Sequence, residues 1–241
     1  MDPIERARRD LVIANRILAH QQVLDAYGHV SIRHPLDPGR HLLARSVSPG
    51  IIVPDDIVEF THDGVPVGPE KRPLYLERFI HGAIYATRPE VNAVLHAHAE
   101  DVLPFTISSV PFRPVIQNVG DMGSPVPVWD IADKFGSNTD LLVRTLEQGR
   151  DLAATLGQGR IALMRSHGFV GAGRTLNDLV RLSVFVPRNA RVLMAALRLG
   201  GDIKSLHPGE MAARLAIDPE SPAMRRGWDY WAIEAGCEAL L

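Results

Sequence analysis

The pattern of hydrophobic and polar positions divides the chain into alternating helical and extended segments. Apolar residues recur at helical spacing between residues 4 and 26, and Gly28 follows as a stop. The same criterion predicts helices over residues 74–87, 138–156 and 175–199, with Pro187 expected to kink the last one. Short apolar runs bounded by turn residues predict strands over 29–33, 40–44, 57–60, 92–98, 114–116, 126–128 and 161–164.

Strands interleaved with helices indicate a layered α/β domain. Neither an internal repeat nor a low-complexity linker interrupts the pattern, so residues 1–241 are interpreted as one domain. The segment from about 205 to 241 contains prolines and three aromatic residues, Trp228, Tyr230 and Trp231. It is expected to form short helices that wrap the surface or contact another subunit.

Composition excludes several classes of partner. The formal net charge is −2, which predicts no affinity for nucleic acid or for an anionic membrane. No apolar run approaches the roughly 20 residues needed to cross a bilayer. The N-terminal residues lack the apolar core of a signal peptide, and the single cysteine, Cys237, cannot form an internal disulfide. A cytoplasmic location is therefore expected.

Two histidines close together provide the first candidate chemistry. His96 and His98 end the predicted strand 92–98, and side chains two residues apart in a strand point to the same face. A third histidine, His167, follows the predicted strand 161–164. Three histidines with an open position are a common catalytic metal arrangement. The alternative for the pair alone is two imidazoles bonded to backbone carbonyls.

A carboxylate is a candidate for the same site. Glu77 lies in the predicted helix 74–87, on about the same face as Ile80 and Ile84. A glutamate on a partly apolar face is costly to bury without a partner or a task. Glu77 is therefore predicted to be a fourth ligand or an acid/base group, with a solvated ion pair to Arg72 or Arg78 as the alternative.

Together these residues resemble the class II aldolase/adducin family. The resemblance rests on Glu77, the run Arg88 to His98 and Ser166-His167-Gly168, and it extends over about residues 8–200. It implies a three-layer α/β/α fold with a mostly antiparallel central sheet. It also implies a divalent metal held by His96, His98 and His167, a proton-transfer role for Glu77, and a homotetramer with active sites between subunits.

Two departures from the family pattern bear on the substrate. Aldolases that grip a phosphate usually carry Gly-Asn-x-Ser where this chain has Gly28-His29-Val30-Ser31. They also place two serines before the glutamate, where this chain has Tyr75 and Leu76. The bulky side chains remove hydrogen-bond donors that a phosphate needs, so a phosphorylated sugar is not expected.

The run Gly28-His29-Val30-Ser31-Ile32-Arg33 with Arg45-Ser46-Val47-Ser48 downstream is more similar to the decarboxylase branch of the family. The predicted substrate is a small hydroxylated aromatic or heteroaromatic carboxylate. Arg33, Arg45 and Arg165 are candidate carboxylate clamps, since guanidinium pairs bidentately with carboxylate. The loop carrying Ser46 and Ser48 is a candidate anion site through its backbone N–H groups.

In the predicted reaction, negative charge that develops as CO2 leaves is stabilised by the metal, and Glu77 or His29 delivers a proton to carbon. His29 is alternatively a residue that orients a hydroxyl or carboxylate. Zinc, manganese and iron(II) all suit such a ligand set. Two other functions stay open: retro-aldol cleavage of an unphosphorylated hydroxy acid, and a non-catalytic, adducin-like module.

Overall fold

A seven-stranded mixed sheet forms the centre of the molecule. The computed structural model describes residues 2–241. The strand order is β3-β2-β1-β4-β7-β6-β5, and every neighbouring pair is antiparallel except β5 and β6. The strands are β1 (His29–Arg33), β2 (Arg40–Ala44), β3 (Ile57–Thr61), β4 (Ala93–Ala97), β5 (Val128–Trp129), β6 (Ile161–Met164) and β7 (Gly168–Gly173).

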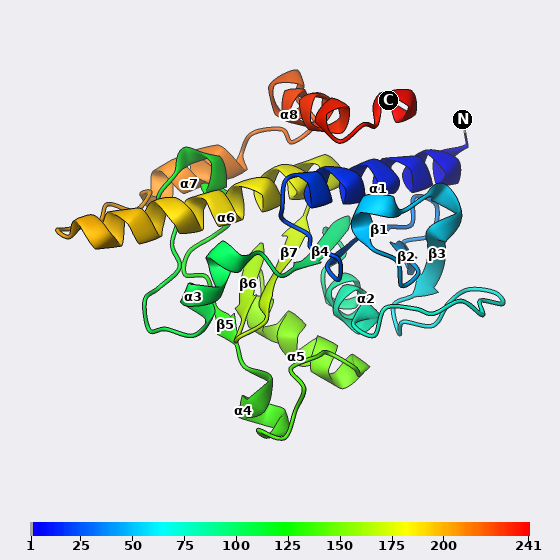
Figure 1. Ribbon diagram of the computed structural model, residues 1–241, viewed down its shortest axis with the longest axis horizontal. Coiled ribbons are helices and arrows are strands. Elements are labelled where there is room, and N and C mark those ends of the chain that lie inside the picture. The colour runs from blue at the N-terminus through cyan, green and yellow to red at the C-terminus, as the bar shows by residue number, and fades with distance from the viewer. Residues whose placement is uncertain (1) are drawn as a thin grey trace.

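Helices pack against this sheet and against one another (Figure 1). They are α1 (Pro3–His20), α2 (Arg78–Thr87), α3 (Leu103–Thr106), α4 (Ile131–Phe135), α5 (Leu146–Leu156), α6 (Leu176–Leu199), α7 (Pro208–Leu215) and α8 (Pro222–Glu234). Helices α1 and α6 lie together on one side of the strands, and α2 and α5 lie together on the other.

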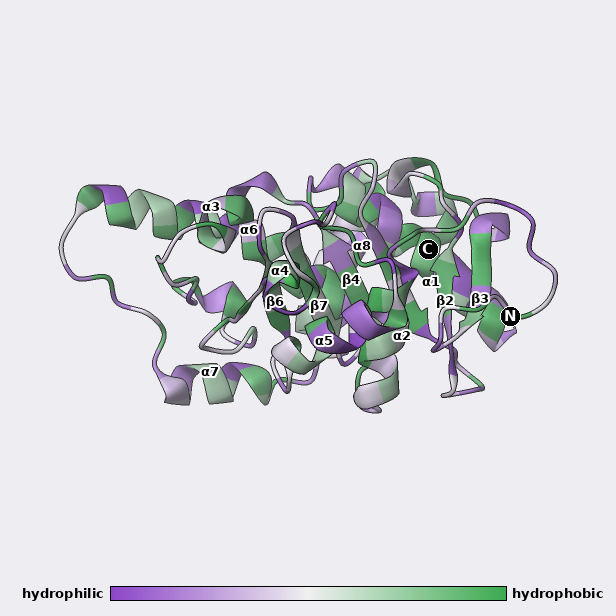
Figure 2. Cartoon of the chain, turned by 90° about the horizontal axis from the view of Figure 1, so that it is seen from below, coloured by the Kyte–Doolittle hydropathy of each residue, from purple (hydrophilic) through white to green (hydrophobic). Residues whose placement is uncertain are grey.

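The alternation of side chains in the central strands produces two separate apolar clusters. In β4, Leu95 belongs to the cluster that contains the apolar face of α1, whereas Val94 belongs to the cluster with Ile84 of α2. Each fully buried aliphatic side chain contributes about 2 kcal/mol of burial free energy. In Figure 2 the long helix α6 alternates hydrophobic and hydrophilic colouring, as expected for a helix with one buried face.

Most predicted elements are present, but several of their boundaries are corrected. The first helix ends at His20 rather than at residue 26, because Gln22 adopts a positive φ of 57°. The helix predicted over 138–156 begins only at Leu146, because Thr145 and Gln148 form a capping box there. The helix predicted from residue 74 begins at Arg78, so Glu77 is its N-cap residue rather than a residue inside it.

The strand predictions fail in two places. Residues 114–116 are irregular, and the strand predicted over 126–128 is the two-residue β5, Val128–Trp129. Strand β7 was not predicted, because glycines at 168, 171 and 173 hide its apolar alternation. Gly173 is needed where α6 crosses the strand, since a Cβ there would lie 2.6 Å from Cβ of Leu179.

The C-terminal segment forms short helices, as predicted. Trp228 and Trp231 of α8 are buried in the cluster shared with α1 and α6, whereas Tyr230 is exposed. The segment is therefore anchored by two of the three aromatic residues. Among residues 2–241, no helix is both long enough and apolar enough to span a membrane.

Candidate metal centre

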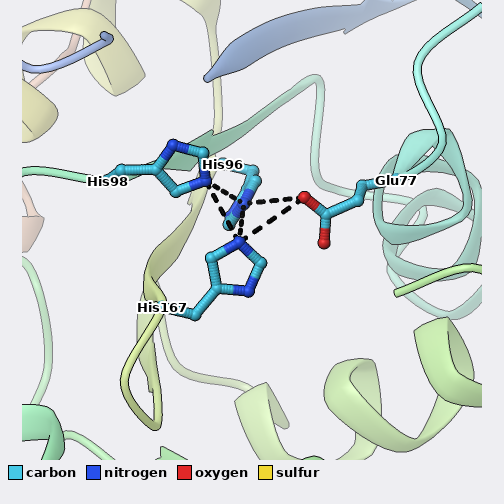
Figure 3. A group of neighbouring side chains, drawn as sticks. All are labelled: Glu77, His96, His98 and His167. Carbon is cyan, nitrogen blue, oxygen red and sulfur yellow. Dashed lines mark hydrogen bonds and ion pairs between the residues drawn. The ribbon is translucent and has the colours of Figure 1, made fainter. Parts of the chain in front are cut away.

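Four side chains from three separate parts of the fold converge at one end of the central strands (Figure 3). His96 lies in β4, and His98 follows one residue beyond the end of that strand. His167 lies in the turn between β6 and β7, and Glu77 caps α2. The pairing of β4 with β7 is what brings His167 beside the histidine pair.

The three imidazoles point their Nε2 atoms at one another. The Nε2–Nε2 distances are 3.0 Å between His96 and His98, 3.3 Å between His96 and His167, and 3.1 Å between His98 and His167. Glu77 Oε2 lies 3.3 Å from Nε2 of His96 and 3.5 Å from Nε2 of His167.

The other nitrogen of each imidazole has an acceptor. His96 Nδ1 lies 3.3 Å from the carbonyl of Phe169, and His167 Nδ1 lies 3.0 Å from the carbonyl of Leu141. His98 Nδ1 lies 3.0 Å from a carboxylate oxygen of Asp25. Because all three acceptors require a donor, the protons lie on Nδ1 and the Nε2 lone pairs face one another. Such an arrangement is repulsive without a cation between the rings, so the residues fit a metal.

The spacing of the donor atoms agrees with this interpretation. Zn–N bonds of about 2.0–2.1 Å in tetrahedral geometry place neighbouring nitrogens about 3.3 Å apart. Three neutral imidazoles and a carboxylate suit zinc, manganese or iron(II).

The charge states of Glu77 and His167 also suit the binding of a metal ion. Burial would raise the pKa of Glu77, but His96, His167 and the amide of Val143 outweigh burial and lower the pKa to about 2. Val143 N–H donates to Glu77 Oε1 over 2.9 Å. Burial, together with the neighbouring His96, lowers the pKa of His167 to about 4. At neutral pH the site therefore combines an anionic carboxylate with an uncharged imidazole.

The turn that carries His167 has an unusual backbone. Ser166 adopts a φ of 56°, which costs about 1 kcal/mol for a residue with a side chain. Gly168 lies against the end of β4, where a Cβ would be 2.1 Å from the carbonyl oxygen of Ala97. The glycine thus permits the close approach that places His167 beside His98.

A pocket of about 370 Å³ opens beside the four side chains. This volume lies in the range of small-molecule sites. Leucine and tyrosine side chains form much of its wall, and no lysine or arginine contributes among residues 2–241. The lining residues are Tyr27, His29, Ser46, Leu74, Tyr75, Leu76, Glu77, His98, Leu142, Ser166 and His167.

The predicted site residues are only partly brought together. His29 and Ser46 line the pocket together with Glu77, His98 and His167, whereas Ser48 does not. His29 is 2% exposed and pairs across the sheet with His96.

The three candidate arginines have other partners. Arg33 donates to the carbonyls of Val91, Pro38, Tyr85 and Arg88 and does not reach the pocket. Arg45 donates to Asp56 over 2.7 Å, and Arg165 pairs with Asp130. None of the three lines the pocket, so the structure gives no support to Arg33, Arg45 or Arg165 as carboxylate clamps.

Asp25 was not anticipated from the sequence. Its carboxylate accepts from the amides of Tyr27 and Gly28 and orients His98. The contact joins residues 73 positions apart, and nothing in the local sequence around Asp25 indicates it. Burial raises the pKa of Asp25, but these two amides and His98 outweigh burial and lower it.

Comparison with known proteins agrees with the geometry. The family model described as "Class II Aldolase and Adducin N-terminal domain" matches residues 9–194. The chain is 36% identical to the decarboxylase tropJ of Talaromyces stipitatus, over 94% of this chain and 92% of that protein. It is 26% identical to the 3,4-dihydroxyphthalate decarboxylase of Arthrobacter keyseri, over 86% and 85% of the two chains.

Solved structures show the same fold. An aldolase II superfamily protein from Pseudomonas syringae superimposes with a TM-score of 0.79 at 22% identity, over 100% of this chain and 96% of that one. L-fuculose 1-phosphate aldolase from Glaciozyma antarctica gives a TM-score of 0.74 at 19% identity, over 96% and 88%. The chain therefore belongs to the class II aldolase and adducin family and, by its similarity to the decarboxylases, to the carbon–carbon lyases of that branch.

Proposed function

We propose that this protein is a metal-dependent decarboxylase of a hydroxylated aromatic or heteroaromatic carboxylate. The observation that carries the proposal is the convergence of His96, His98, His167 and Glu77 beside an apolar-walled pocket without a cationic lining residue among residues 2–241. Apolar walls suit a planar ring. The two similar decarboxylases support the same reaction class.

In this proposal His96, His98 and His167 hold one divalent ion, with zinc, manganese and iron(II) as candidates. The ion supplies Lewis-acid stabilisation of the negative charge that develops as CO2 leaves. The side chains of Leu74, Leu76 and Leu142 exclude water from the reacting carbon.

Glu77 moves the proton. Its low pKa keeps it ionised, so it accepts the proton of the substrate hydroxyl rather than arriving with one. When the bond from the ring carbon to the carboxylate breaks, the electron pair stays on the ring and Glu77 returns the proton to that carbon. The products are CO2 and a ring phenolate, and Glu77 is again a carboxylate, so atoms and charge balance.

A homotetramer with active sites between subunits accompanies this proposal. The pocket rim includes Tyr27, which is 76% exposed, and Leu76, which is 50% exposed. Large exposed apolar side chains at a rim are typical of a surface that another chain covers. Light scattering coupled to size-exclusion chromatography should give four times the 26.5 kDa subunit mass, and a monomer would contradict the tetramer.

The test of the reaction uses the purified protein with zinc, manganese or iron(II) and 3,4-dihydroxyphthalate together with related hydroxylated ring carboxylates. CO2 release that depends on the metal is the expected result, with an equal amount of ring product lacking one carboxylate. A coupled dehydrogenase assay for aldehyde or pyruvate runs in parallel. Aldehyde or pyruvate without CO2 would contradict the decarboxylase and favour retro-aldol cleavage.

A further inference from the structure

His29 is connected on its far side to a chain of buried polar groups. His29 Nδ1 lies 2.7 Å from His81 Nε2, and His81 Nδ1 lies 2.6 Å from the hydroxyl of Ser31. That hydroxyl lies 2.9 Å from the hydroxyl of Tyr85. All four residues are at most 2% exposed, so solvent supplies no alternative partner along the chain.

The direction of the chain is set at its inner end. Among the described residues the Ser31 oxygen is the acceptor within reach of the Tyr85 hydroxyl, because the other contact of that hydroxyl, the backbone amide of Val94, can only donate. A buried hydroxyl proton without an acceptor costs about as much as a lost hydrogen bond or more. Tyr85 therefore donates to Ser31.

The Ser31 hydroxyl must then donate a hydrogen bond to one of two acceptors. The ring nitrogen of His81 lies at 2.6 Å, whereas the carbonyl of Val94 lies at 3.5 Å, which is the limit of a hydrogen bond. Ser31 therefore donates to His81 Nδ1. A neutral His81 then carries its proton on Nε2 and donates it to His29 Nδ1.

We infer that Tyr85, Ser31 and His81 hold His29 in the Nε2–H tautomer, so that His29 presents a hydrogen-bond donor to the pocket. The Nε2 atom makes no hydrogen bond within the described residues, and the imidazole lines the pocket. Burial and the neighbouring histidines lower the pKa of His29 well below its ordinary value, in agreement with a neutral ring. His81, Ser31 and Tyr85 are positioning residues.

The same chain assigns separate tasks to His29 and Glu77. If His29 gave its proton to carbon, a new proton would have to reach it from Tyr85 through Ser31 and His81. That transfer would leave a buried tyrosinate. Burial raises the pKa of Tyr85 and makes that end state unfavourable. His29 therefore binds a substrate oxygen through Nε2–H, and proton transfer to carbon stays with Glu77. This assignment rests on the proposed function, whereas the tautomer does not.

Neutron diffraction from crystals of the zinc-loaded protein tests the tautomer directly, without a variant or a substrate. Deuterium is expected on Nε2 of His29 and on Nε2 of His81, with the Ser31 hydroxyl directed at His81. Deuterium on Nδ1 of His29 would overturn the inference. The result holds whether or not a decarboxylase activity is found, so the failure of one proposal is separable from that of the other.

A matched pair of variants tests the role in substrate binding. Ser31→Thr and Ser31→Val add equal bulk, but only threonine keeps the hydroxyl. With 3,4-dihydroxyphthalate as substrate and zinc content measured in each variant, Ser31→Val is expected to lower kcat/KM roughly 10- to 100-fold relative to Ser31→Thr at equal zinc content. Equal kcat/KM values for two folded, zinc-loaded variants would contradict the positioning role.

Discussion

At the scale of single residues, the bonding of the outer nitrogens leaves the inner nitrogens of the three imidazoles suited to hold a cation. His96 is fully buried, and within residues 2–241 its Nε2 atom faces Nε2 of His98, Nε2 of His167 and Oε2 of Glu77. His96→Ala should therefore reduce bound zinc from about one ion per subunit to almost none. Elemental analysis after dialysis measures this, with the exposed His20→Ala as control. Full zinc occupancy in folded His96→Ala would show that the ligand assignment is wrong.

Asp25 contacts the candidate ligand His98 rather than the metal position itself. Asp25→Asn keeps a side-chain oxygen for the amides of Tyr27 and Gly28 but removes the charge that faces His98. Loss of such an outer partner typically weakens metal binding 10- to 100-fold, and we expect a decrease of about that size here. Competition with a zinc chelator measures the affinity. Asp37→Asn, in a turn remote from the site, should leave zinc affinity unchanged.

At the scale of elements, a buried network of charged side chains connects the residue before β6 to α6. Arg160 lies 2.6 Å from Asp121 and 2.7 Å from Asp178, and Arg181 of α6 also contacts Asp121. All four side chains are less than 10% exposed. Removing one partner from a buried ion pair leaves an uncompensated charge.

Asp121→Asn is therefore expected to lower the free energy of unfolding by about 3–5 kcal/mol. Urea denaturation of the metal-free protein measures the loss. The control is Asp140→Asn, which removes an exposed ion pair with Arg144 and should lower the free energy of unfolding far less, because solvent screens that pair. An equal decrease in the free energy of unfolding of the two variants would show that the network stabilises the fold no more than a surface ion pair does.

Element boundaries were predictable wherever local chemistry fixes them. Thr175 begins α6 as the sequence indicates, because its side chain accepts from the amide of Asp178. Strand β7 was missed because its glycines serve contacts with other elements, and those contacts have no local trace. Arg33, Arg45 and Arg165 were reasonable carboxylate clamps by residue type, but packing gives each of them a different partner.

At the scale of the whole molecule, the buried histidines couple stability to pH. Burial lowers the pKa of His81 to about 3 and of His167 to about 4, from 6.5 in the unfolded chain. At pH values between these lowered pKa values and 6.5, the unfolded state binds more protons than the folded state. Stability from these groups is thus full above about pH 6.5 and is lost as the pH falls toward 4.

The free energy of unfolding of the metal-free protein should therefore decrease from about pH 7.5 to about pH 5, a range above the titration of ordinary carboxylates. Urea titrations at several pH values measure the slope. His167→Gln should make the slope shallower, whereas the exposed His20→Gln should leave it unchanged. A stability that rises on acidification would contradict the neutral, buried state of these imidazoles.

The sequence by itself determined the family and singled out the candidate ligands. His96 and His98 share a face because a strand repeats every two residues, and His167 stands in a tight turn next to a glycine. Tertiary structure decided what surrounds them. It placed Glu77 at a helix N-cap, brought Asp25 to His98 and linked His29 to Tyr85. These contacts join residues 19 to 73 positions apart, and only the packing of the sheet against its helices sets such distances.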